Sequence, residues 1–123
     1  MGRRIAVEIT GCPQVEVELD DGRTAKAIVE ALPVEAEAAR WGDEVYFSLP
    51  VDAPAGHEVD AVNVGDVAWW GPGKAFCLFF GPTPVSDHRI RPASPVTVVG
   101  RVVGDPRALE AARDGAEVRL YPL

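Results

Sequence analysis

The feature that most constrains the fold is an aromatic segment in the middle of the chain, residues 64–84, with the sequence VGDVAWWGPGKAFCLFFGPTP. It contains two short apolar runs, residues 67–70 and 75–80, separated by the turn-forming group Gly-Pro-Gly-Lys. Two such runs around a turn predict a β-hairpin. Because side chains alternate along a strand, apolar residues fall on both faces of each arm. This pattern is typical of strands covered on both sides, so we expect the central Cys77 and Leu78 to be buried.

Six further segments outside the hairpin alternate apolar and polar residues as strands do. They are residues 4–9, 15–19, 34–40, 44–49, 96–103 and 116–121. Residues 34–40 consist largely of Ala and Glu, which favour helices, but Pro33 separates them from the preceding segment and we interpret them as a strand. Gly100 interrupts a strand pattern and indicates a bulge there.

Two short helices are expected, at residues 24–32 and 106–114. Thr24 is a candidate N-cap for the first, and Asp105 followed by proline is a typical start for the second. Together with about eight mostly antiparallel strands, they predict a mainly β fold, a closed barrel with two short helices.

Length and charge limit what the chain can be. Its 123 residues suit a single domain, residues 1–123, with its own hydrophobic core. The net charge of −7, without any run of Lys or Arg, argues against nucleic acid and anionic membranes as partners. No apolar run approaches the roughly 20 residues that cross a bilayer. The N-terminal MGRRIAVEIT is not typical of a signal peptide, so we expect a cytoplasmic protein.

Several motifs resemble those of cyclophilins. VGDVAWW (residues 64–70) resembles their Gly-Asp strand, FCLFF (76–80) their strand with paired phenylalanines, and VVGRVVGD (98–105) the strand that enters their last helix. More closely, GDVAWWGPGKAFCLFFGPTP and the downstream IRPASPV are similar to the small prokaryotic cyclophilin-like family of unknown function, over nearly the whole chain. The resemblance implies a closed cyclophilin-like β-barrel and no assigned reaction.

The catalytic signature of cyclophilins is not seen. Their catalytic strand carries Phe-His-Arg, whereas residues 44–48 read EVYFS, and Asn63 lies near the place of a cyclophilin Gln. The Arg is thought to polarise the prolyl amide in the transition state, so its loss removes the main electrostatic contribution. We therefore hypothesise a non-catalytic module that binds a small molecule or peptide in an aromatic cleft. The alternatives are a weak peptidyl-prolyl isomerase, or an enzyme of another class on the same barrel.

Seven side chains are the candidates for this cleft: Tyr46, Trp69, Trp70, Phe79, Phe80, Arg89 and Arg91. The alternative for the aromatic residues is a place in the core. The two arginines, in the long connection of residues 81–95, would anchor an anionic group or else pair with the protein's own carboxylates. An Arg beside the aromatic cleft would favour the isomerase, and a carboxylate clustered with a His would favour another enzyme class.

No cofactor or metal is expected. His57 with Glu58 and Asp60, and His88 beside Asp87, lie in predicted loops at spacings that match no metal-ligand motif. We interpret them as solvated side chains. The two cysteines form no CxxC pair. The expected partner is an unidentified small molecule or peptide, and both a monomer and a dimer remain open.

Overall fold

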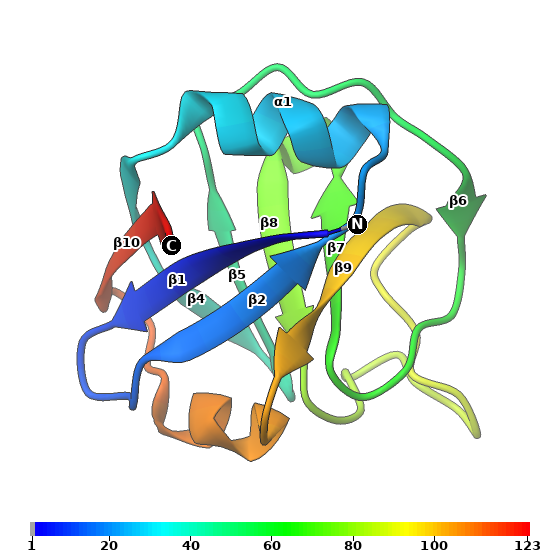
Figure 1. Ribbon diagram of the computed structural model, residues 1–123. Coiled ribbons are helices and arrows are strands. Elements are labelled where there is room, and N and C mark those ends of the chain that lie inside the picture. Colours follow the sequence, from blue (N-terminus) through cyan, green and yellow to red (C-terminus); the bar gives the residue numbers. More distant parts are fainter. Residues whose placement is uncertain (1) are drawn as a thin grey trace.

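One strongly curved antiparallel sheet makes up most of the computed structural model, which describes residues 2–123 (Figure 1). Its ten strands are β1 (Arg3–Ile9), β2 (Val15–Leu19), β3 (Val34–Glu37), β4 (Ala39–Trp41), β5 (Glu44–Ser48), β6 (Glu58–Val59), β7 (Asp66–Trp70), β8 (Ala75–Phe79), β9 (Val96–Val103) and β10 (Glu117–Pro122). The helical segments are α1 (Arg23–Ala31) and the 3-10 helices η1 (Gly71–Gly73) and η2 (Pro106–Ala111). Within residues 2–123 no helix has the length and apolar character needed to cross a membrane.

The strands follow the order β3-β10-β1-β2-β9-β7-β8-β5-β4, with β6 added beside β9. This order is an open path, so the predicted closed barrel is not confirmed, although the mainly β fold is. β3 and β4 lie at opposite ends of the path but are separated in the chain by Ala38 alone. The Ala38 N–H bonds to the carbonyl of Ala116 at 2.8 Å, whereas β4 pairs with β5. Residues 34–40, which were predicted as one strand, therefore contribute to strands at two opposite edges of the sheet.

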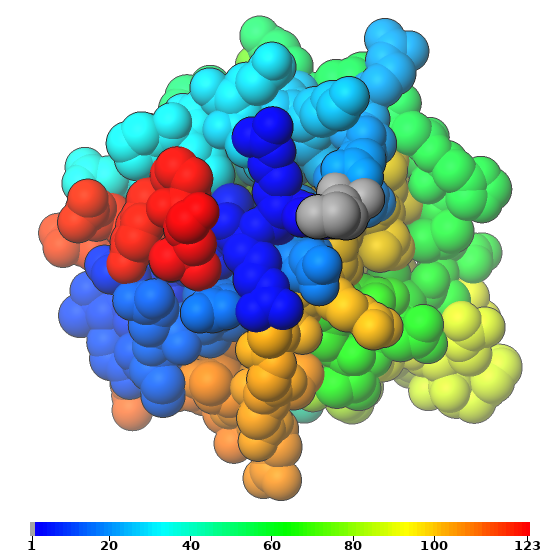
Figure 2. Space-filling model, viewed as in Figure 1, coloured from blue at the N-terminus to red at the C-terminus, as the bar shows by residue number. Residues whose placement is uncertain are grey.

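The two ends of the chain lie side by side on one face. β1 pairs with β10 from Ile5 opposite Pro122 to Ile9 opposite Val118. Figure 2 shows the result, with the red C-terminal residues against the dark blue residues of β1. The N-terminal and C-terminal strands are thus neighbours in the same sheet, next to its edge strand β3.

The helices lie at the two open ends of the curved sheet, α1 at one and η2 at the other (Figure 1). α1 begins close to the predicted position, but Gly22 occupies its N-cap position, and the Thr24 hydroxyl donates instead to the carbonyl of Pro54. The second predicted helix is a 3-10 helix that ends at Ala111. Asp105 caps it as expected, accepting from the N–H of Arg107 at 2.9 Å.

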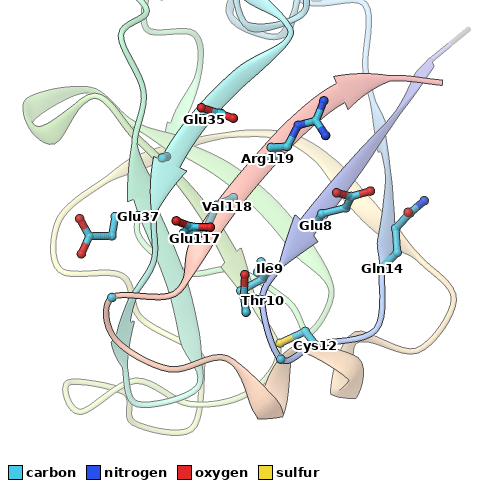
Figure 3. Close-up of a pocket in the computed structure, with 13 residues that line it drawn as sticks. Glu8, Ile9, Thr10, Cys12, Gln14, Glu35, Glu37, Glu117, Val118 and Arg119 are labelled. Carbon is cyan, nitrogen blue, oxygen red and sulfur yellow. The ribbon is translucent and has the colours of Figure 1, made fainter.

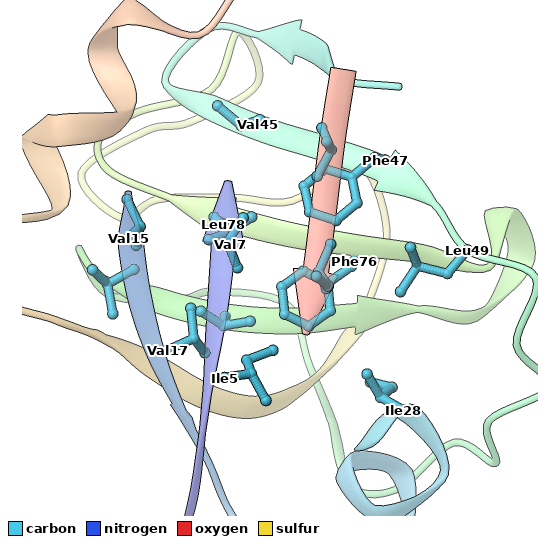
Figure 4. Packing of buried hydrophobic residues seen from close by; sticks show 14 of the residues in the cluster. Ile5, Val7, Val15, Val17, Ile28, Val45, Phe47, Leu49, Phe76 and Leu78 are labelled. Carbon is cyan, nitrogen blue, oxygen red and sulfur yellow. The ribbon is translucent and has the colours of Figure 1, made fainter. Parts of the chain in front are cut away.

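The main core fills the inside of the curved sheet (Figure 4). Phe47 of β5 and Phe76 of β8 stack there with their ring centroids 5.5 Å apart. Ile28 of α1 and Leu109 of η2 are both fully buried and close the two ends of this core. The burial of alternate residues on β2 agrees with the pattern read from the sequence, whereas β1 also buries Ala6 between Ile5 and Val7.

A second, smaller apolar cluster lies on the other face of β7 and β8. Its buried members are Val62, Ala68, Ala75, Cys77, Phe79 and Val96. β8 is consequently buried along its whole length, with Cys77 at 2% exposure and Leu78 at 0%. The prediction that the hairpin is covered on both faces is confirmed. The cover comes from two connections that meet where Val62 bridges to Ile90.

The bulge predicted at Gly100 is confirmed, because Val67 pairs with Gly100 and the next residue of β7 pairs with Val98. Gly100 itself allows β9 to approach β2, since a Cβ there would overlap the backbone oxygen of Glu18. The polar stretch 50–60, predicted as a loop, contributes the short strand β6 to the edge of β9.

Candidate functional site

A small apolar cleft of about 150 Å³ opens on the outer face of β5 and β8, beside the second cluster. Eight residues line it: Trp41, Glu44, Tyr46, Trp70, Cys77, Pro92, Ala93 and Val96. They come from five strands and from the connection before β9. The cleft therefore exists only when residues far apart in the sequence are brought together by the fold.

Strand register explains why these side chains share one face. Tyr46 of β5 lies opposite Cys77 of β8. Glu44 precedes Tyr46 by two residues, so both project to the same side of the sheet. Trp41 of β4 lies opposite Glu44 and extends this face to the end of the sheet. Trp70 joins from the hairpin, two residues after Ala68, which is also opposite Cys77.

Trp70 is held in place from two sides. Its indole Nε1–H donates a hydrogen bond to the Ser94 hydroxyl at 2.6 Å. On the other side the ring packs closely over the hairpin turn, because a Cβ on Gly73 would lie 2.7 Å from the Trp70 ring. These contacts give the cleft a wall that is already formed without a ligand.

Glu44 is the charged residue of the cleft, and its side chain is buried. The residue is 6% exposed, and burial raises its pKa from 4.5 to about 7 because the ionised form is poorly solvated there. The thiol of Cys77 is its hydrogen-bond partner and lowers the pKa by a smaller amount. Among the described residues no Lys, Arg or His forms an ion pair with Glu44.

Cys77 is a protonated thiol in this setting. Burial raises its pKa well above 9.0, and the nearby charge of Glu44 raises it further. The sulfur also lies 3.8 Å from the carbonyl oxygen of Ala75. A thiol without access to its thiolate form is a poor nucleophile, so Cys77 serves here as a small apolar group and a weak donor.

The structure divides the five aromatic candidates. Tyr46 and Trp70 line the cleft. Trp69, at 2% exposure, and Phe80, at 7%, belong to the main core, and Phe79 is fully buried in the second cluster. The expectation of a place in the cleft is therefore wrong for these three, because strand alternation and the covering connection enclose them.

The two arginine candidates lie outside the cleft. Arg91 pairs with Asp87, Nε to Oδ1 at 3.2 Å, and with Asp60, also at 3.2 Å. Arg89 lines a separate hollow beside Asp60. Arg91 therefore pairs with the protein's own carboxylates, which is the alternative that the sequence left open for it.

Trp41 and Glu44 are not among the seven candidates drawn from the sequence, although Trp41, next to a predicted turn, could be read as either a rim or a core residue. The sequence signal for Glu44 is its position two residues before Tyr46. This spacing places the Glu44 carboxyl on the same face of the strand as Tyr46, which was a predicted cleft residue. Trp41 follows a break in the strand pattern, and its position became informative only with the pairing of β4 and β5.

A larger hollow of about 1080 Å³ lies on the outer face of β1, β10 and β3 (Figure 3). Its charged side chains are Glu8, Glu35, Glu37, Glu117 and Arg119. All except the half-buried Glu8 are exposed, and Tyr121 donates its hydroxyl hydrogen to Glu8. We call this surface the acidic face; its exposure is typical of a solvated sheet surface.

No three metal-ligating side chains gather anywhere in residues 2–123. His88 is exposed, with its Nδ1 3.7 Å from Asp87, and His57 lines a hollow near α1. Neither histidine lines the cleft, so Glu44 has no histidine beside it there.

Comparison with known proteins agrees with the sequence motifs. The sequence profile of the Cyclophilin-like family matches residues 3–121. The chain belongs to the cyclophilin-like family. The solution structure of a hypothetical protein from Archaeoglobus fulgidus is similar to this cyclophilin-like protein, with 42% sequence identity and a TM-score of 0.85. The similarity covers 99% of this chain and 95% of the archaeal one. A comparison with curated proteins found no match.

Proposed function

We propose that this cyclophilin-like protein is a binding module, and that the cleft beside Glu44 holds a small group of a small molecule or peptide. The observation that carries the proposal is the convergence of three aromatic side chains, from Trp41, Tyr46 and Trp70, on one cleft with a buried carboxyl. An apolar hollow with a few placed polar groups is the usual form of a small-molecule site.

The size of the cleft restricts what enters it. Its volume of about 150 Å³ is below the ~300–1,000 Å³ of pockets that enclose a whole drug-sized ligand. A cavity of roughly this volume accepts a benzene-sized group. The occupant is therefore one end of a ligand, such as a side chain of a peptide, with the remainder lying outside.

The isomerase alternative lacks support in the cleft. Catalysis would need a positive donor directed at the twisted amide, and no arginine lines the cleft. Arg40 lies 5.0 Å from the ring centroid of Phe80, but its guanidinium donates to the carbonyls of Gly42, Glu110 and Ala112. These bonds hold Arg40 beside η2, at one end of the curved sheet.

An enzyme of another class is the second candidate function. The observation in its favour is the raised pKa of Glu44. A carboxyl with a pKa of about 7 inside a cleft is suited to general acid–base work. The cleft offers neither a reactive thiol nor a histidine to act with it. Binding is accordingly the function that the geometry supports best.

The test is a fragment screen followed by nuclear magnetic resonance of isotope-labelled protein. The chain has three tryptophans, so the indole signals of Trp41 and Trp70 report on the cleft while that of buried Trp69 serves as an internal reference. We expect small apolar, aromatic or amine fragments to shift the first two in a saturable way. Trp70→Ala should abolish the response, and Tyr121→Ala, on the acidic face, should not. A screen whose hits all map to other surfaces would overturn the proposal.

A further inference from the structure

We propose that the cleft selects an organic cation, an amine or methylated ammonium group, which binds Glu44 between Trp41, Tyr46 and Trp70. This inference rests on the proposed binding function and names the chemical class of its ligand. It is drawn from the lining of the cleft, the isolation of the carboxyl, the surrounding charge and the volume.

The aromatic lining favours a cation. The face of an aromatic ring carries partial negative charge and attracts a cation within about 6 Å of its centre, most strongly for Trp. Two tryptophans and one tyrosine, from β4, β7 and β5, line a single small hollow here. Several aromatic side chains around one small space form the arrangement that recognises ammonium groups.

The carboxyl of Glu44 lacks a counter-charge among residues 2–123. Glu44 is 6% exposed, lines the cleft, and forms no ion pair in the part of the chain that the structure describes. Its hydrogen-bond partner Cys77 is a weak donor. Burial of a carboxylate without a cation is unfavourable. A bound ammonium group would supply the missing positive charge. A protonated amine would also donate hydrogen bonds to the carboxyl, whereas a fully methylated ammonium group would make close electrostatic contact with it.

The charged groups around Glu44 do not replace such a ligand. Cys77 on β8 and Tyr46 on β5 share its face, and neither is cationic. The nearest arginine along the chain, Arg40 of β4, is directed to Asp43, with Nη2 3.6 Å from Oδ1, and to backbone carbonyls of other residues. No Lys, Arg or His lines the cleft, and the net charge of −7 further favours a cation over an anion.

The experiment compares choline with its neutral isostere dimethylbutanol, in which carbon replaces the charged nitrogen. Both are titrated into labelled protein while the indole signals of Trp41 and Trp70 are followed. We expect choline to bind at least about tenfold more tightly than the isostere, a difference of about 1.4 kcal/mol. Glu44→Gln should remove that preference while keeping the isostere's binding, and the fold is checked by the unchanged Trp69 signal.

A matched control separates the cleft from general charge. Glu35→Gln removes one carboxylate from the acidic face and should leave choline binding unchanged. Choline binding should strengthen between about pH 6 and pH 8, as Glu44 ionises.

Three results would overturn the inference. They are equal binding of choline and the isostere, equal loss in Glu35→Gln and Glu44→Gln, and no response of the cleft signals to choline. In each case the proposed function stands if other fragments still shift Trp41 and Trp70. It fails together with the inference only if no fragment does so.

Discussion

Glu44 and Cys77 lie on the same outer face of the neighbouring strands β5 and β8, and the thiol of Cys77 is the hydrogen-bond partner of the Glu44 carboxyl. The pair is enclosed by the aromatic wall of the cleft and by the connection before β9. Burial raises the pKa of both groups, so near neutral pH the thiol is protonated and the carboxyl is partly so. This relationship leads to the first two predictions.

The stability of the protein should fall as pH rises from about 4.5 to about 7. Glu44 keeps its proton in the folded state over the range in which the unfolded chain has already lost it, because its pKa is raised from 4.5 to about 7. Its contribution is complete below the lower value and is lost as pH passes the higher one. The decrease in the free energy of unfolding should be on the order of 3 kcal/mol. Urea unfolding across this range, compared with Glu44→Gln, measures it.

The difference in the free energy of unfolding between wild type and Glu44→Gln isolates the contribution of Glu44, because the other carboxyls titrate in both proteins. The variant should lack the decrease and be the more stable protein above pH 7. Parallel curves for the two proteins would contradict the burial of Glu44.

Cys77 should react slowly with thiol reagents in the native protein. It is 2% exposed and its pKa is raised, so accessible thiolate is scarce. Cys12→Ser isolates its reaction, which is followed by absorbance with a disulfide reagent. The reverse variant, Cys77→Ser, isolates the half-buried Cys12, which should react faster. Native labelling of Cys77 as rapid as that of an exposed thiol would disprove the enclosed position.

Gly100→Ala should destabilise the protein by about 1–3 kcal/mol, the usual effect of overpacking. A Cβ at this position would overlap the oxygen of Glu18 and lie 2.9 Å from the Cα of Leu19. Gly71→Ala is the matched control, because a Cβ on Gly71 meets nothing within 4 Å. Thermal unfolding of both variants measures the effect. Equal midpoints would mean that β2 and β9 are farther apart than the structure has them.

Glu37→Lys should stabilise the protein by about 0.2–1 kcal/mol, the range of cross-strand charge pairs. Glu37 of β3 lies directly opposite Glu117 of β10, which sets two negative charges side by side. Glu35→Lys is the control and should destabilise, since Glu35 lies opposite Arg119. Both effects should weaken in high salt. Effects of the same sign for the two variants, or destabilisation by Glu37→Lys with stabilisation by Glu35→Lys, would refute the register of this sheet end.

Peptidyl-prolyl isomerase activity should be absent or very weak. No arginine lines the cleft, and loss of one well-placed donor typically raises a barrier by about 2.7–4 kcal/mol, or about 10²–10³ in rate. Isomerisation of a proline peptide, followed beside a cyclophilin, tests this. Turnover comparable to the cyclophilin would be incompatible with a purely binding role. Arg89→Ala and Arg91→Ala would then show whether the loop arginines replace the missing charge.

The aromatic hairpin, five of the six other strand segments and α1 were predictable from the sequence, whereas residues 34–40 form the two strands β3 and β4 and not one. Alternation of apolar and polar residues is a local property, and it states which residues of a strand share a face. The burial of Cys77 and Leu78 followed from runs that are apolar on both sides. The family was also readable, because its motifs are contiguous and coincide with these strands.

Only the tertiary structure decided which of those faces forms a cleft. Alternation places Trp69 and Trp70 on opposite faces without stating which one meets solvent, and the curvature of the sheet sends Trp69 into the core. The break at Ala38 separates β3 from β4, and the pairing of β4 with β5 carries Trp41 to Glu44. Curvature, strand pairing and cover by distant connections depend on contacts between segments far apart in the chain, so no local pattern records them.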